Sequence, residues 1–263
     1  MPEGDTVHNL AARLRPVLEG EVLTACDIRV PRYAAVDLTG RTVESVTARG
    51  KHLLINAGNA VIHSHLKMEG EWHVYRPGER WRRPAHTARA VLAVDGAQVV
   101  GFSLGTLEIL TPAEADGALA HLGPDPLGPD WDADRAAANL AAAPGRPVGL
   151  ALLDQTVLAG VGNVYRNELC FLRGAHPATP VGECGDTLTW ADGAARLLRA
   201  NLGRTRRVTT GVDRNGMRAF VYDRARRPCL RCGTAIVAGS LGGAGEVERA
   251  IWWCPRCQPQ ASN

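Results

Sequence analysis

The first residues of the chain could carry covalent chemistry. If Met1 is removed from Met1-Pro2-Glu3-Gly4-Asp5, Pro2 becomes a secondary amine. An α-amino group has a pKa of roughly 8, against about 10.4 for a lysine side chain, so more of it is unprotonated near neutral pH. Such an amine can attack a sugar aldehyde and form a cationic iminium, which makes adjacent bonds easier to break. Glu3 is the nearest carboxyl group for the proton transfers that follow.

The same stretch also has a plain structural explanation. Proline and acidic side chains commonly begin a helix. Asp5 or Thr6 can cap a helix whose apolar positions fall at 7, 10, 11, 14 and 17, and Pro16 and Gly20 would end it. Taken alone, these residues fit a helix start better than a catalytic terminus, so the rest of the chain must decide.

Four cysteines near the C-terminus have the spacing of a metal site. Cys229 and Cys232 form one C-x-x-C pair, and Cys254 and Cys257 form another after 21 residues. Four thiolates in this pattern predict a closed, structural Zn²⁺ site. Two disulfides or four buried thiols are the alternatives, and the absence of a secretory signal argues against disulfides. The loop 233–253 contains Arg249, which a rigid hairpin could present to a phosphate backbone.

A glycine-rich turn lies between two predicted helices in residues 153–168. Such a turn at a helix start exposes backbone N–H groups that favour an anion. Asn163 is the candidate N-cap and could add a side-chain donor. An ordinary helix hairpin is the alternative explanation.

The distribution of charge indicates a polyanionic partner. The net charge is +3, but residues 201–257 carry +7 and residues 1–200 carry −4. A solvated charged face explains this asymmetry equally well. Arginine supplies 28 of the 30 basic residues, so Lys51 and Lys67 are the only lysines. If an amine does covalent chemistry, the candidates are therefore Pro2, Lys51 and Lys67.

Periodicity predicts an α+β chain with distinct parts. Eight short runs punctuated by turn residues predict a β-sandwich: 22–30, 42–48, 51–56, 60–65, 71–75, 89–94, 97–103 and 106–110. Four Ala- and Leu-rich stretches predict helices at 132–142, 147–158, 162–172 and 185–202. We expect a sandwich domain with a leading helix at 1–120, a proline-stiffened linker at 121–131, a helical domain at 132–222 and a zinc finger at 223–263.

Composition places the protein among ordinary globular proteins. Hydrophobic residues make up 45% and charged residues 22%. No apolar run approaches the ~18 residues that a membrane span needs, and the N-terminus does not look like a signal peptide. We expect a cytoplasmic protein that has no membrane partner.

Together, the N-terminal Met-Pro-Glu-Gly, the turn from Gln155 to Glu168 and the four-cysteine finger resemble the formamidopyrimidine-DNA glycosylase and endonuclease VIII family. The three motifs occur in the family's order and span nearly the whole chain. The resemblance implies a β-sandwich, a helical domain with helix–two-turns–helix and a zinc finger. It also implies a base-excision repair enzyme that acts on duplex DNA with damaged bases or abasic sites. By the same resemblance, we expect a monomeric bacterial protein that acts at the nucleoid.

The resemblance also implies roles for individual residues. Pro2 would attack C1′ of the damaged nucleotide, with Glu3 as its acid/base partner. Lys51 would contact phosphate and transfer a proton during β-elimination. Asn163 would bind phosphate, and Arg249 would grip the flipped nucleotide's phosphate and assist δ-elimination.

The segment 63–70 matches the family loop that fills the gap left by a flipped base. Lys67 and Met68 would contact DNA there, with Met68 as the wedge; a core methionine is the alternative. Glu69 would be repelled by phosphate, so how this loop enters the duplex stays open. His121 weakly matches a basic DNA contact.

Two departures from the family pattern favour oxidised pyrimidines as substrates. Asp5 stands where many relatives have proline, a variant closer to the endonuclease VIII branch. The region between Arg204 and Tyr222 is also short for the loop that covers 8-oxoguanine. We therefore predict a glycosylase and AP lyase that cleaves by β,δ-elimination through a Pro2 Schiff base. An 8-oxoguanine-directed glycosylase, a non-catalytic damaged-DNA-binding module and, more remotely, a zinc-ribbon RNA-binding protein are the alternatives.

Overall fold

The computed structural model describes residues 2–243 and 247–260. Met1, whose removal the catalytic hypothesis requires, lies outside these residues, as do positions 244–246 of the predicted finger loop. The chain divides into two compact units, residues 1–121 and 122–263, and each is described here by itself. This division does not separate a helical domain from a finger domain, so that boundary stays a prediction.

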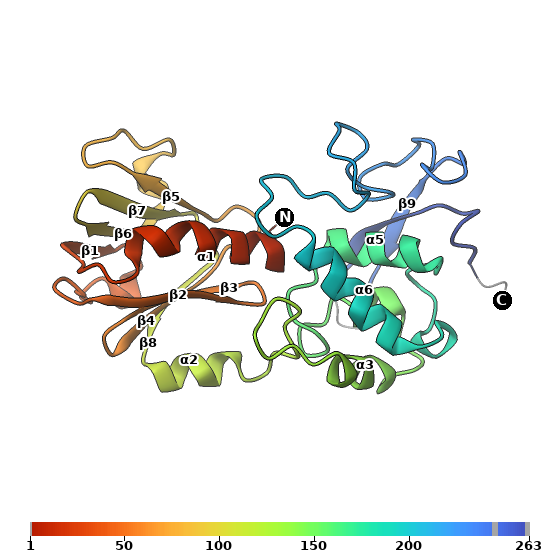
Figure 1. Cartoon of the computed structure of the whole chain (residues 1–263), viewed down its shortest axis with the longest axis horizontal. Helices are drawn as coiled ribbons and strands as arrows, with labels where there is room; N and C mark the ends of the chain where they lie inside the picture. Colours follow the sequence, from red (N-terminus) through yellow and green to blue (C-terminus); the bar gives the residue numbers. More distant parts are fainter. Residues whose placement is uncertain (1, 244–246, 261–263) are drawn as a thin grey trace. The chain divides into compact units, whose positions relative to one another are not determined.

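Unit 1 is a β-sandwich with one long helix (Figure 1). One antiparallel sheet has the strand order β1-β6-β7-β5, and the other has the order β2-β3-β4-β8. The eight predicted strands are confirmed, with small shifts at their ends. The elements of unit 1 are α1 (Gly4–Leu18), β1 (Ala25–Ile28), η1 (Pro31–Tyr33), β2 (Val43–Arg49), β3 (His52–Ala57), β4 (Ala60–His65), β5 (Glu71–Tyr75), η2 (Ala85–Thr87), β6 (Ala88–Val94), β7 (Ala97–Phe102), β8 (Thr106–Leu110) and α2 (Pro112–Leu119).

Helix α1 begins earlier and ends later than its sequence suggested. Glu3, rather than Asp5 or Thr6, is the N-cap, and its backbone N–H donates to Thr6 Oγ1 at 3.4 Å. Pro16 lies inside the helix instead of ending it. The expected apolar face is buried and joins inward-facing side chains of both sheets in one core. Burial of this face therefore fixes α1 against the sandwich.

Helix α2 was not predicted from the sequence. Its N-cap is Thr111, and Thr111 and Glu114 form a capping box, with the Glu114 backbone N–H donating to Thr111 Oγ1 at 3.3 Å. Only Ala115 and Leu119 of this helix are buried. Two buried positions are too few to reveal a helical period in the sequence. The capping pair Thr111 and Glu114 is the signal that could have identified α2.

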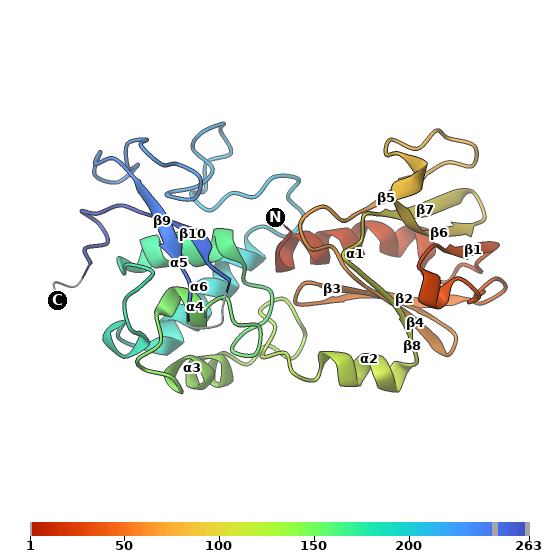
Figure 2. The same ribbon diagram turned by 180° about the vertical axis from the view of Figure 1, so that it is seen from behind.

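Unit 2 combines helices with a β-hairpin (Figure 2). Three of the four predicted helices are confirmed, whereas the stretch 147–158 contains only one short helix followed by turns. The elements are α3 (Ala133–Ala141), α4 (Val148–Ala151), α5 (Asn163–Arg173), η3 (Val181–Glu183), α6 (Thr187–Arg199), β9 (Val237–Leu241) and β10 (Arg249–Trp253).

Part of the segment expected to be a linker is packed into unit 2. Residues 122–126 are buried. The Gly123 N–H donates to the Gln155 carbonyl at 2.8 Å, and the Ala159 N–H donates to the Pro124 carbonyl at 2.9 Å. A Cβ atom on Gly123 would lie 2.5 Å from the Thr156 carbonyl oxygen, so only glycine allows this approach. These residues thus brace the turn after α4 instead of acting as a spacer.

A buried carboxylate holds the long irregular segment that follows α6. Glu168 on α5 is fully buried and accepts hydrogen bonds from the backbone N–H groups of Phe220, Val221 and Tyr222 at 2.7–2.9 Å. It also accepts from the Thr209 hydroxyl. Because a buried charge is tolerated only when it is fully hydrogen-bonded, Glu168 determines the path of residues 209–222.

We predict that Glu168→Gln lowers the free energy of unfolding by roughly 2–4 kcal/mol, because an amide NH₂ group would face backbone donors that now bind a carboxylate. Urea denaturation measures this change. Glu183→Gln, at an exposed position, is the control and should leave stability unchanged. Equal stability of the two variants would contradict the role given to Glu168.

Candidate functional site

The beginning of α1 and the β2–β3 turn lie at the same end of unit 1. At the other end of α1, the Gly20 N–H donates to the Val43 carbonyl at 2.8 Å and the Val46 N–H donates to Glu19 Oε1 at 2.6 Å. Helix α1 and strand β2 therefore run antiparallel, and the N-terminal end of α1 lies toward the end of β2 (Figure 1). This arrangement brings the end of the unit that carries Pro2 and Glu3 toward Lys51.

Pro2 directly precedes a fixed and buried residue. Glu3 has no exposed surface and occupies the N-cap position, whereas Pro2 is half-buried. The N-cap geometry holds the backbone of Glu3 against the first turn of α1. Pro2 is therefore attached to a rigid part of unit 1, as a reacting amine requires.

Lys51 lies in a two-residue hairpin turn. Arg49 pairs with His52 across the two strands, which leaves Gly50 and Lys51 as the turn. Gly50 has φ +56°, the left-handed conformation that a type II′ turn needs at its first central position. The glycine thus permits the tight turn that places Lys51 between the strands, as its sequence context indicated.

The loop after β4 presents Met68 to solvent. Met68 is 63% exposed, whereas Leu66 and Gly70 on either side are buried. The Gly70 N–H donates to the Leu66 carbonyl at 2.9 Å, and the Lys67 N–H donates to His65 Nδ1 at 2.9 Å. The alternative that Met68 is a core methionine is therefore wrong for this structure.

The same loop contains a strained residue and lies beside Lys51. Lys67 has φ +54°, which is uncommon for a residue with a side chain. His52 pairs with His65, so the residue before β3 and the loop after β4 lie at one end of the sheet. Unit 1 therefore brings Lys51 and the Lys67–Gly70 loop together. His121 is an exposed residue that follows α2, and its charge helps to lower the pKa of His52.

A stripe of polar side chains crosses the same sheet, and sequence reasoning missed it. His52 Nδ1 lies 2.8 Å from His63 Nε2, and His63 Nδ1 lies 2.9 Å from Glu108 Oε2. The His65 ring lies edge-on to the His52 ring, with their centroids 4.9 Å apart. Alternation in the His63-Ser64-His65 stretch was the available signal, because i and i+2 residues of a strand share a face. We call His52, His63, His65 and Glu108 the histidine stripe.

Burial keeps two members of the histidine stripe neutral. It lowers the pKa of His52 to about 3, with further contributions from the neighbouring His65, His63, His121 and Lys67. Burial likewise lowers the pKa of His65 to about 4, assisted by the positive charges of Lys67 and Lys51. Both imidazoles are therefore uncharged near neutral pH.

In unit 2, the start of α5 holds the finger hairpin. Asn163 is the first residue of α5, and the N-cap is Gly162, which corrects the expectation that Asn163 caps the helix. The buried Asn163 side chain donates from Nδ2 to the Ala250 carbonyl at 3.0 Å. Ala250 directly follows Arg249 on β10. The structure therefore brings Asn163 and the exposed Arg249 into one neighbourhood.

Two further residues of α5 contribute to this junction, and sequence reasoning did not single them out. Arg166 has no exposed surface and donates to the Ala250 carbonyl at 2.8 Å and to Asn163 Oδ1. The side chain of Asn167 accepts from the Trp252 N–H at 2.9 Å. Buried polar groups need such partners, so the first two turns of α5 fix the position of β10.

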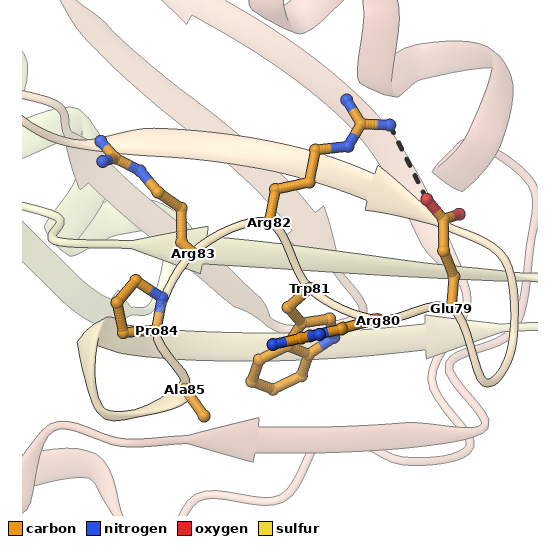
Figure 3. Close-up of a pocket in the computed structure, with 7 residues that line it drawn as sticks. All are labelled: Glu79, Arg80, Trp81, Arg82, Arg83, Pro84 and Ala85. Atoms are coloured by element: carbon orange, nitrogen blue, oxygen red, sulfur yellow. Dashed lines mark ion pairs between the residues drawn. The ribbon is translucent and has the colours of Figure 1, made fainter.

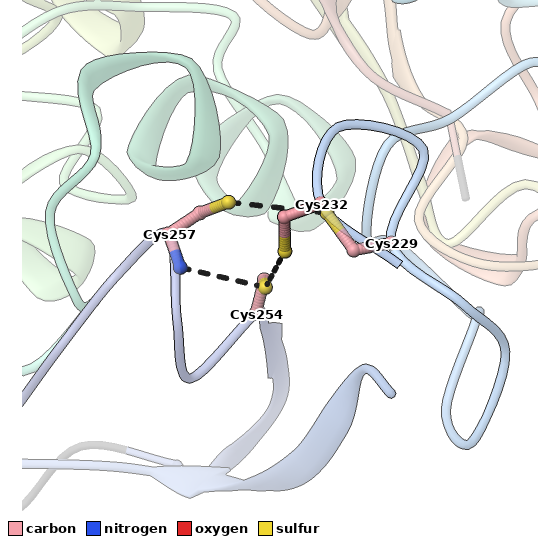
Figure 4. A group of neighbouring side chains, drawn as sticks. All are labelled: Cys229, Cys232, Cys254 and Cys257. Atoms are coloured by element: carbon pink, nitrogen blue, oxygen red, sulfur yellow. Dashed lines mark hydrogen bonds between the residues drawn. The ribbon is translucent and has the colours of Figure 1, made fainter. Parts of the chain in front are cut away.

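The four cysteines of the predicted finger converge (Figure 4). Their Sγ atoms all lie within 4.8 Å of one another, with Cys229 and Cys257 4.0 Å apart and Cys232 and Cys254 3.4 Å apart. Tetrahedral metal–thiolate bonds of about 2.3 Å place sulfur atoms roughly 3.8 Å apart, which these separations match. The residues present therefore fit a bound metal ion.

One hollow of unit 1 lies elsewhere. It has a volume of about 580 Å³ and is lined by residues 79–85, where Glu79 and Arg82 form an ion pair of 3.7 Å (Figure 3). None of the predicted catalytic residues lines it. This hollow therefore does not mark the site, which is identified by residue types and their positions on the elements.

Two family models match the chain. The formamidopyrimidine-DNA glycosylase N-terminal domain matches residues 1–103, and the formamidopyrimidine-DNA glycosylase H2TH domain matches residues 122–188. The chain belongs to the formamidopyrimidine-DNA glycosylase family. Together the two matches cover more than half of the chain.

Relatives named endonuclease 8 or Nei2 are more similar to this chain than a relative named formamidopyrimidine-DNA glycosylase is. A probable endonuclease 8 2 of Streptomyces coelicolor is 54% identical, covering 98% of this chain and 94% of the relative. The DNA-(apurinic or apyrimidinic site) lyase Nei2 of Mycolicibacterium smegmatis is 53% identical, covering 98% and 99%. The formamidopyrimidine-DNA glycosylase of Streptococcus pneumoniae is 31% identical, covering 98% and 99%. The expected endonuclease VIII-like branch is therefore confirmed.

Solved structures of the family share the fold. A MutM in complex with DNA containing carbocyclic 8-oxo-G superimposes with a TM-score of 0.81 at 23% identity, covering 98% of this chain and all of that one. The α+β architecture predicted from the sequence is thus confirmed. Among the described residues, no helix has the length and apolar character that crossing a membrane requires.

The lowered pKa values of His52 and His65 predict how stability depends on pH. An unfolded histidine binds a proton near pH 6.5, whereas these folded histidines resist it until about pH 3 and 4. The free energy of unfolding should therefore fall as the pH falls from about 6.5 toward 4, by up to about 1.4 kcal/mol per pH unit for His52. Thermal melting at several pH values measures it.

His52→Asn should flatten this dependence, because asparagine binds no proton in either state. His86→Asn, which alters an exposed histidine in η2, is the control and should leave the slope unchanged. A slope that is the same in wild type and His52→Asn would contradict the assignment.

Proposed function

We propose that the chain removes oxidised bases, preferentially pyrimidines, from duplex DNA through a Schiff base on Pro2 and then cleaves the strand by β,δ-elimination. The chain is a DNA glycosylase with AP-lyase activity that acts in DNA repair. The observation that carries the mechanism is the position of Pro2, next to the buried N-cap Glu3 and at the same end of unit 1 as Lys51.

The proposed chemistry divides the reaction into covalent steps. The Pro2 nitrogen attacks C1′, the base leaves, and the resulting iminium withdraws electrons from the sugar. Loss of a C2′ proton then expels the 3′ phosphate in β-elimination. Lys51 and Glu3 are the groups placed to transfer protons in these steps. Arg249, exposed beside Asn163, would bind phosphate and assist δ-elimination.

The loop after β4 supports a wedge role for Met68. A flipped base leaves a gap in the stack, and an apolar side chain inserted there offsets part of the few kcal/mol that flipping costs. Met68 is exposed on a loop that two hydrogen bonds hold closed. Lys67 and Glu69 are also exposed on this loop, so Lys67 would contact phosphate, and Glu69 must point away from it. His121, exposed at the end of unit 1, would add a phosphate contact.

The preference for pyrimidines is supported by the short segment 204–222 and by similarity to relatives named endonuclease 8. Glu168 fixes residues 209–222 through three backbone donors. A short, anchored segment has little freedom to fold over a bulky purine. A panel of single-lesion oligonucleotides tests this preference, and faster release of 8-oxoguanine than of thymine glycol would contradict it.

We predict that an extra residue ahead of Pro2 abolishes covalent trapping on abasic-site DNA by sodium borohydride. An acylated nitrogen has no nucleophilic lone pair, so the trapped fraction should fall by roughly 100-fold or more. Gel analysis of protein–DNA adducts measures it. Proteolytic removal of the extra residue should restore trapping.

Lys51→Met and Lys67→Met test the rival amines and should both still be trapped. Undiminished trapping with the blocked terminus would exclude Pro2 as the nucleophile and point to a lysine. If wild-type protein binds damaged DNA but neither traps nor cleaves on any lesion, the non-catalytic alternative holds.

We further propose that the metal ion held by the four cysteines is Zn²⁺. Four thiolates with no open position favour zinc and make the site structural. The β9–β10 hairpin precedes Cys254 directly, so the metal would fix the strand that carries Arg249.

Purified protein should contain about one equivalent of zinc by elemental analysis, and Cys254→Ser should lose it. Because the hairpin would loosen, the same variant should bind DNA more weakly and melt at a lower temperature. Cys184→Ser, outside the cluster, is the control and should retain its zinc. Another metal at full occupancy would contradict the proposal of zinc.

A further inference from the structure

The histidine stripe links three neighbouring strands on one face of a sheet. His63 pairs with Glu108 across β4 and β8, and His52 pairs with His65 across β3 and β4. Inward-facing residues of β3, such as Leu53 and Ile55, belong to the core, so His52 lies on the opposite, outward face. None of the steps assigned above uses this stripe.

The hydrogen bonds of the stripe define which nitrogen atoms carry protons. A carboxylate can only accept, so His63 Nδ1 donates to Glu108 Oε2. In the neutral form of His63, Nε2 accepts the hydrogen bond from His52 Nδ1. In this tautomer, His52 Nε2 carries a lone pair and no proton. Glu108 thus determines, through His63, that His52 Nε2 can act as a base.

The two ends of this hydrogen-bonded series, Glu108 and His52, lie in different surroundings. The Glu108 side chain is 36% exposed, whereas the His63 side chain is 6% exposed. At the other end, His52 directly follows Lys51, and its ring contacts His65, whose pKa is lowered by the positive charges of Lys51 and Lys67. The hydrogen-bonded series therefore runs from solvent at Glu108, through the buried imidazole of His63, to the neighbourhood of two lysines.

The charged and titratable groups around His52 keep it neutral. His63 and His65 face it from β4, Lys67 from the following loop and His121 from the end of unit 1. This positive surrounding does not suit a cation, and among the described residues only the four cysteines lie close enough together to hold a metal ion. A series of neutral imidazoles can still pass a proton. Each ring accepts a proton at one of its nitrogens while it releases the proton of its other nitrogen.

We propose that His52, His63 and Glu108 form a proton path that serves Lys51 during strand cleavage. His63 and Glu108 act through His52 and not on the substrate: they relay the proton, and they fix the tautomer of His52. The inference rests on the proposed role of Lys51 in β-elimination. It explains why the buried His63 imidazole joins His52 to a carboxylate that reaches solvent.

Protons balance along the path. One proton leaves the Lys51 ammonium and bonds to His52 Nε2, while His52 Nδ1 gives its proton to His63 Nε2 and His63 Nδ1 gives its proton to Glu108 Oε2. Glu108 then releases the proton to water. The imidazoles end neutral, and Lys51 becomes the free amine that can accept the C2′ proton.

Glu108→Gln tests the path at its exposed end. A neutral amide can donate to His63 Nδ1 as well as accept from it, so the tautomer is no longer fixed. In single-turnover reactions on abasic-site DNA, we expect β-elimination to slow by roughly 10-fold or more, with borohydride trapping within about twofold of wild type.

A matched control lies on the other sheet. Glu71 accepts a hydrogen bond from His73 Nε2 at 2.8 Å, so Glu71→Gln removes the charge from a glutamate–histidine pair outside the path. It should leave elimination unchanged. The elimination rate should be measured as a function of the fraction of heavy water. Its dependence should indicate that several protons move in the rate-limiting step for wild type and for Glu71→Gln, and one proton for Glu108→Gln.

His63→Phe breaks the middle of the path and should slow elimination as Glu108→Gln does. If this variant fails to fold, the exposed Glu108 variant decides alone.

Unchanged elimination in Glu108→Gln overturns the inference, as does an equal loss of trapping and elimination, which would indicate a structural role. Unchanged elimination in Lys51→Met overturns it as well. Wild-type trapping that does not depend on the Pro2 amine overturns the proposed function instead.

Discussion

Glu168 places a full negative charge inside unit 2, and the surrounding chain is arranged to satisfy it. Its two oxygens accept from three consecutive backbone N–H groups and one hydroxyl. These bonds require residues 220–222 to turn toward α5, where Phe220 stacks on Phe171 at 4.9 Å. Phe171 and Val221 share a small core with Cys229, Ile236 and Cys254. The carboxylate, the 209–222 segment and the clustered cysteines thus depend on one another.

The other buried polar residues of α5 extend this dependence to the finger hairpin. Asn163, Arg166 and Asn167 hold β10 through the carbonyl of Ala250 and the N–H of Trp252. Burying such groups costs free energy unless each finds a partner, so the contact is specific as well as stabilising. Arg249 is therefore presented from a strand that is held at both ends, by α5 and by the cysteine cluster.

Unit 1 uses its sheet faces differently. The inward face of β3 and β4 contributes Leu53, Ile55 and Ile62 to the core with α1. The outward face carries the histidine stripe, which a merely stable sandwich would not need. Because His52 pairs with His65, the stripe ends where Lys51 and the Met68 loop lie together. The polar face is thus continuous with the residues proposed to act on DNA.

Most strands and helices followed from the sequence, because alternation and the 3.6-residue period report burial directly. The exceptions have local causes. Helix α2 buries too few residues to show a period, and the turns after α4 follow from hydrogen bonds to residues 123 and 124. The N-cap of α1 was misplaced by two or three residues because several acidic and hydroxyl side chains in a row could each cap it.

The sequence by itself determined the family and the cysteine set and proposed Pro2, Glu3, Lys51, Asn163 and Arg249 as site residues, since these rest on residue type and spacing. Tertiary structure alone decided that Asn163 binds the strand of Arg249, that Glu168 anchors a segment more than 40 residues away, and that His52, His63 and Glu108 form one chain. The reason is that strand register and helix packing bring together residues whose separation in sequence carries no local signal.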